Sequence, residues 1–178
     1  MENLQRISNL SRKLRLTCTG LIFALPVLCA LFWIFFNQLY PTLALLSLPV
    51  PVDHDLPGWS RSGGFLADLI PLGVIIYGLR RLRDLFSLYE GGLIFTADNV
   101  QCYRSLGRTL FVWVACNVLN HTLLGFVLTI DNPPGHRLLV LGLNSGDFTG
   151  MFVGAVVLTV SWIMDEARKI QEEQAMII

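Results

Sequence analysis

Long runs of apolar residues, separated by polar segments, are the dominant pattern of this chain. No charged residue occurs at 16–52 or at 109–130. Two further apolar runs are interrupted only by Asp68 and by Asp147. A bilayer core about 30 Å thick is crossed by roughly 20 helical residues. The pattern therefore predicts four membrane-spanning helices.

The fold class follows from the need of backbone N–H and C=O groups to form hydrogen bonds in lipid. Each span must bond its own amides, and the alternating pattern of barrel strands is absent. We expect an all-α polytopic membrane protein, with four transmembrane helices in an antiparallel bundle and a cytoplasmic amphipathic helix. The spans are placed at about 16–39, 62–79, 109–130 and 144–164, the cytoplasmic loop at 80–108 and the outer loops at 40–61 and 131–143, all within one domain, 1–178.

The segment between the second and third spans carries signals of its own helix. Gly91 and Gly92 interrupt the chain, and Thr96 is a good N-cap candidate. From Ala97 to Arg108 apolar residues recur every third position, which predicts an amphipathic helix. The segment is either a functional element or only a connector.

Composition and charge agree with a membrane protein and indicate its orientation. Hydrophobic residues make up 53% of the chain, charged residues 15%, and the mean hydropathy is +0.58. All but Arg61 and Arg137 of the 13 Lys and Arg residues fall on one side of the predicted spans. The positive-inside rule then places both termini and the middle loop in the cytoplasm. Anionic lipid explains these basic residues better than nucleic acid does, so no direct nucleic-acid contact is expected.

The sequence gives no sign of a catalytic, cofactor or metal site. The four cysteines and three histidines show neither CxxC nor HxxxH spacing, and no GxSxG or HExxH motif occurs. We therefore expect no enzyme activity, no cofactor and no metal ion.

Polar residues inside the predicted spans are the first candidate site. Asp68 and His121 lie about 18 Å and about 20 Å from the cytoplasmic ends of their helices, so they share a depth. We predict that they face each other, with Asn117 and Asn120 on the same face as His121. The cluster is either a proton- or ligand-sensing centre or interhelical hydrogen bonding that only stabilises the fold.

The fourth span carries a stripe of small residues. Glycine recurs at every fourth position, at Gly142, Gly146, Gly150 and Gly154. Such a face lets two helices approach closely, either within the chain or between two copies in a homo-oligomer. Asp147, next to the stripe, is expected near the outer surface, where it is solvated or caps the helix.

A family resemblance rests on two phrases of the second half of the chain. The first comprises Gly92, Phe95, Thr96, Asn99, Leu106 and Gly107, and the second comprises Glu172, Glu173 and Gln174. With them the chain resembles the bacterial membrane family called domain of unknown function 2975. The resemblance implies a four-helix inner-membrane protein and supplies no catalytic residues. Some relatives are encoded beside small helix-turn-helix regulators, which implies a cytoplasmic regulator protein as partner.

These observations favour a signalling or regulatory membrane component. Its cytoplasmic loop and C-terminal tail would bind the regulator, through a partner surface that we place at Phe95, Thr96, Asn99, Tyr103, Glu172 and Glu173. The alternative is a small transporter or channel subunit, although no inverted repeat or pair of broken helices is evident. A membrane enzyme lacks the cluster of acids or histidines that its chemistry needs.

Overall fold

The protein consists of long helices. The structure, a computed structural model, describes residues 2–40, 55–94, 96–130 and 143–176. Its helices are α1 (Glu2–Ile34), α2 (Phe36–Leu39), α3 (Gly58–Glu90), α4 (Ala97–Thr129) and α5 (Ser145–Met176). Four of them, α1, α3, α4 and α5, are long and apolar enough to cross a membrane. The predicted all-α membrane architecture is confirmed. Phe95, Gly142 and most of both predicted outer loops lie outside the described residues.

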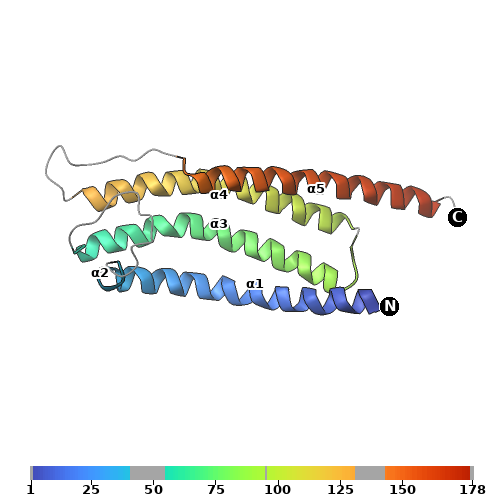
Figure 1. Ribbon diagram of the computed structural model, residues 1–178, viewed down its shortest axis with the longest axis horizontal. Coiled ribbons are helices and arrows are strands. Elements are labelled where there is room, and N and C mark those ends of the chain that lie inside the picture. Colours follow the sequence, from blue (N-terminus) through green and yellow to red (C-terminus); the bar gives the residue numbers. More distant parts are fainter. Residues whose placement is uncertain (1, 41–54, 95, 131–142, 177–178) are drawn as a thin grey trace.

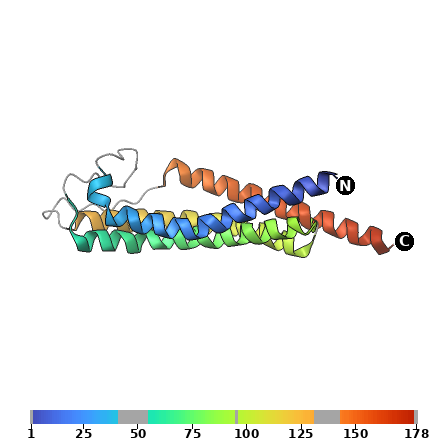
Figure 2. The same ribbon diagram turned by 90° about the horizontal axis from the view of Figure 1, so that it is seen from below.

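The four long helices run antiparallel and pack in the order in which they occur in the chain (Figure 1). α3 contacts α1 and α4, and α4 also contacts α5. α1 and α5 therefore lie at the two edges, and α3 and α4 form the middle (Figures 1 and 2). Large apolar side chains point away from the neighbouring helices, with Phe23 71% and Phe152 70% exposed. A surface of this kind is suited to lipid contact.

The turn between α3 and α4 is much shorter than the predicted loop at 80–108. α3 continues to Glu90 and α4 begins at Ala97, so only residues 91–96 connect them. The expected amphipathic helix is thus the first part of α4 and not a separate element. α4 continues through Gly107. The missing side chain at this position makes room for Leu158 of α5, whose Cδ2 lies 2.7 Å from where a Cβ would stand.

Both ends of the chain also continue neighbouring spans. The basic N-terminal segment is part of α1, where Ser8 Oγ donates to the carbonyl oxygen of Glu90 (3.2 Å) and Arg15 pairs with the Glu90 carboxylate (3.0 Å). These two contacts hold the start of α1 against the end of α3. At the other end, the helix of the fourth span continues beyond the predicted end at 164 as far as Met176.

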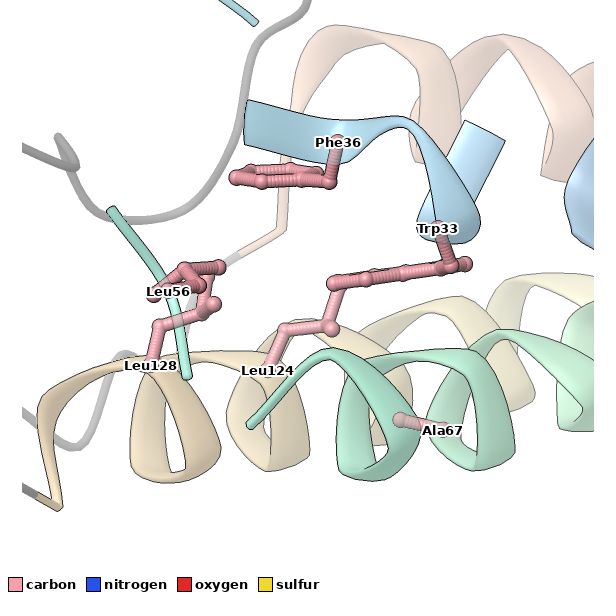
Figure 3. Packing of buried hydrophobic residues seen from close by; sticks show 6 residues of the cluster. All are labelled: Trp33, Phe36, Leu56, Ala67, Leu124 and Leu128. Carbon is pink, nitrogen blue, oxygen red and sulfur yellow. The ribbon is translucent and has the colours of Figure 1, made fainter. Parts of the chain in front are cut away.

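The hydrophobic core lies at the end of the bundle where α1 meets α2. Trp33 and Phe36 project toward Leu124 and Leu128 of α4, with Ala67 of α3 nearby (Figure 3). The rings of Trp33 and Phe36 stack with centroids 5.2 Å apart and planes 10° from parallel. Such pairs contribute about 0.5–1.5 kcal/mol beyond the area that they bury.

One glycine makes room for the core tryptophan. A Cβ placed on Gly64 would lie 2.0 Å from Cη2 of Trp33, a distance that no packed pair of carbons adopts. The indole ring therefore rests directly on the backbone of α3. This close approach brings α1 and α3 together at the depth of the core.

We predict that Gly64→Ala destabilises the protein by about 1–3 kcal/mol, because the new methyl group overpacks the core and displaces Trp33. Thermal unfolding of the detergent-solubilised protein measures the effect. The matched control is Gly20→Ala on α1, where a Cβ would have no neighbour within 4 Å. An equal change in Tm for both variants would show that Trp33 does not depend on Gly64.

Candidate functional site

Asp68 joins three helices within the spans. Its Oδ2 accepts a hydrogen bond from the indole Nε1 of Trp33 on α1 (2.8 Å), and its Oδ1 accepts one from Nδ2 of Asn120 on α4 (2.9 Å). Neutral donors thus hold a carboxylate where water is scarce, which lowers the cost of burying it. Asn120 is only 6% exposed, and its own Oδ1 has no partner among the described residues. The site can therefore accept one further hydrogen bond.

His121 does not pair with Asp68 as predicted. The two hydrogen bonds of Asp68 come from Trp33 and Asn120, and no hydrogen bond links it to His121. Consecutive residues on a helix point about 100° apart, so only one of Asn120 and His121 can face α3. Equal depth was correctly inferred from the sequence, but direction around the helix decided the partner.

Asn117 belongs to a second polar contact. Its Nδ2 donates to Oδ1 of Asp147 on α5 over 2.7 Å, and Asp147 is fully buried. The expectation that Asp147 is solvated is therefore wrong, because the side chain of Asn117 covers it. The predicted polar cluster is thus divided into a pair around Asp68 and a pair around Asp147.

Asp147 also caps the start of α5, as one of the two predicted roles requires. The backbone N–H of Asn144 donates to Oδ2 of Asp147 (2.8 Å), and the backbone N–H of Asp147 donates to Oδ1 of Asn144 (3.1 Å). This reciprocal pair is a capping box. Asn117 is twelve residues, or about 18 Å, from Thr129 at the end of α4. α5 consequently begins well inside the depth of α4, where its free amides need partners from the protein.

The glycine stripe packs against α4 within the chain. A Cβ on Gly150 would meet Trp113 and Val114, and one on Gly154 would meet Phe111 and Leu110. Of the two partners left open for the stripe, the structure places a helix of the same chain against these two positions. Gly146, by contrast, has only Asn144 nearby, so its role lies in the capped turn at the start of α5.

The predicted partner surface is not one continuous surface. Asn99 is fully buried, and its Nδ2 donates to the carbonyl oxygens of Leu93 and Ile94, each over 2.7 Å. Thr96 accepts from the backbone N–H of Asn99 (3.4 Å), which confirms it as the N-cap of α4. Asn99 and Thr96 therefore shape the turn. Among the described residues of this turn, only Gly92 adopts a positive φ, of 75°.

The three further described members of that surface also face different environments. The hydroxyl of Tyr103 lies 2.7 Å from that of Tyr89, so this pair joins α4 to the end of α3. Glu172 and Glu173 are exposed near the end of α5. Among the described members of the predicted surface, only Glu172 and Glu173 in the tail are exposed.

The sequence reasoning missed an ionic cluster around Asp165 on α5. This carboxylate lies 3.2 Å from Arg168, 3.8 Å from Lys169 and 3.9 Å from Arg104 of α4. The spacing of three and four residues within α5 could have indicated the local pairs. Only the structure places Arg104 beside them, at the point where α5 leaves α4.

No group of three or more His, Cys, Asp or Glu side chains within the described residues could hold a metal ion. Instead, Trp33, Asn120 and Asn117 donate to the two carboxylates of the spans, Asp68 and Asp147. The arrangement can position helices and accept a proton or a hydrogen bond near Asp68.

Comparison with known proteins gives one match. A family model described as "Protein of unknown function (DUF2975)" matches residues 31–178. No curated protein and no solved structure shows a significant match to the chain. The resemblance inferred from the two sequence phrases is confirmed over most of the chain.

The partner of Asp68 can be tested with two double-mutant cycles. We expect Asp68→Asn and Asn120→Leu to be coupled by about 0.6 kcal/mol, with an upper limit near 1.7 kcal/mol, as for interhelical bonds in other membrane proteins. Asp68→Asn and His121→Leu should show no coupling, since no bond joins the two side chains. Reversible unfolding in mixed micelles gives the four free energies of each cycle. A larger coupling to His121 would contradict the geometry.

Proposed function

The chain belongs to the DUF2975 family, whose function is unknown, and from this premise we propose that it is a bacterial inner-membrane regulatory component. In this proposal the spans receive a signal, and the cytoplasmic end binds a soluble regulator protein. The excess of basic residues at the end formed by Arg15, Arg108 and Arg168 supports an orientation with both termini in the cytoplasm.

One observation carries the proposal: α5 connects a buried polar contact to an exposed tail without interruption. It begins at the capping box beside Asn117 and continues past the ion pair of Arg104 with Asp165 to Met176. A helix transmits a rotation or a shift along its length because its backbone bonds are continuous. A change at Asp147 would therefore move a tail about 40 Å away.

The tail has the properties of a docking element. Beyond Asp165 its exposed side chains include Glu166, Lys169, Glu172 and Glu173, and Ile170 is 50% exposed between them. Its acidic residues would complement a basic surface on the regulator and set the rate and specificity of association.

A small transporter or channel subunit is the second candidate, and the early start of α5 favours it. Transporters commonly place the ends of discontinuous helices near the middle of the bilayer, where they bind substrate. Here, however, the carboxylate at that helix end already bonds to Asn117 and Asn144. Because this carboxylate is already bonded within the protein, we interpret it as a structural contact and not as part of a transport path. We also propose that the protein is not an enzyme.

The regulator can be sought by cross-linking the full-length protein in native membranes and purifying it with its bound proteins. We expect Glu173→Lys to reduce the yield of a soluble partner by at least about fivefold, because reversed charge would repel the basic surface. Asp55→Lys is the matched control, since this exposed carboxylate lies at the opposite end of the bundle. Recovery of no soluble protein, or equal loss in both variants, would contradict the proposal.

The coupling along α5 needs a separate variant. Asn117→Leu removes the contact with Asp147, and we expect it to change the partner yield although the tail is intact. His121→Leu, on the same helix, should leave the yield unchanged. Unchanged yield in both would limit the role of α5 to presenting its tail.

A further inference from the structure

A groove between α3 and α4 is not used by any contact described above. Its volume is ≈ 480 Å³, which is in the range of small-molecule sites. One part is lined by Ile70 and Val74 of α3 and by Val112 of α4. The part nearer the turn is lined by Tyr77, Ser105 and Arg108. The groove is therefore apolar along the spans and polar and basic at one end.

Two glycines of α3 shape this groove. Gly73 lines it, and a Cβ there would have no neighbour within 4 Å, so a larger side chain would project into the empty space. Gly78 lets α3 approach α4 until its Cβ position lies 3.4 Å from Thr109 Cγ2. The Thr109 hydroxyl donates to the carbonyl oxygen of Ser105 (2.7 Å), which removes one polar group from the lining.

The basic end of the groove carries charge that the protein does not neutralise. Arg108 is exposed and makes no ion pair with any described residue. Arg81 lies over the ring of Tyr77, 5.3 Å from its centroid, and its Nε donates to the Tyr77 hydroxyl (3.2 Å). The guanidinium group of Arg108 thus belongs to the lining, and that of Arg81 lies beside the lining residue Tyr77.

We propose that this groove binds one anionic phospholipid of the surrounding bilayer. An acyl chain would lie along Ile70, Val74 and Val112, and the phosphate would contact Arg108 and the hydroxyl of Ser105. Guanidinium groups bind phosphate through charge-assisted hydrogen bonds, and basic pockets between membrane helices bind anionic headgroups. A free soluble anion would leave the apolar part empty, and a zwitterionic lipid would bring a cationic headgroup beside the guanidinium groups of Arg108 and Arg81 together with its phosphate.

Binding can be measured by native mass spectrometry of the full-length protein in detergent, titrated with phosphatidylglycerol or with phosphatidylcholine. We expect one tightly bound phosphatidylglycerol and clearly weaker phosphatidylcholine binding. Arg108→Gln should weaken phosphatidylglycerol binding about fivefold, the contribution of one arginine near a membrane surface. Arg80→Gln is the matched control, because this exposed arginine is near the same end of α3 but does not line the groove.

The apolar part is tested by filling it. Gly73→Leu should abolish the tight site, whereas Gly20→Leu, which also has open space around it on α1, should leave binding unchanged. Equal losses for Arg108→Gln and Arg80→Gln, or equal affinity for the two lipids, would overturn the site. So would a dimer that replaces the lipid adduct and is lost in Gly73→Leu, since the groove would then hold a second copy of the chain.

Discussion

The structure depends on one constraint: polar groups within the spans must find partners in the protein, because hydrocarbon offers none. The capping box of Asn144 and Asp147 meets this demand at the start of α5. Asn117 donates a further hydrogen bond to the Asp147 carboxylate. Asp68 meets it with an indole N–H and an amide from two other helices. The same bonds that avoid unpaired groups therefore also fix which helix lies beside which.

Close backbone contact is the second element of this packing. Gly64 accepts the indole of Trp33, and Gly107 and Gly154 bring α4 and α5 together. In lipid the association of helices gains little from hydrophobic burial, so small residues contribute by increasing van der Waals contact. Each interface between neighbouring long helices carries a polar bond and a close glycine contact, which together define the rotation of each helix.

Much of this fold could be predicted from the sequence, because spans and caps are local properties. The four apolar runs located the long helices, and Thr96 and the Gly91–Gly92 pair located the turn before α4. What failed depended on tertiary geometry. His121 has the depth but not the direction to reach Asp68, and Asn99 resembles a surface residue until the carbonyl groups that it binds are seen. The buried start of α5 likewise follows from its offset against α4, which no pattern within α5 contains.

The packing of the long helices in the order of the sequence has a consequence for biosynthesis. Each long helix packs on the long helices that come directly before and after it in the chain. A helix leaving the ribosome therefore meets its neighbour already in place, and the assembly needs few contacts between distant parts of the sequence. Chains rich in local contacts fold quickly. The hydrogen bond from Trp33 to Asp68 can form while α4 is still being translated. Asn120 of α4 then donates its hydrogen bond to a carboxylate that Trp33 already holds.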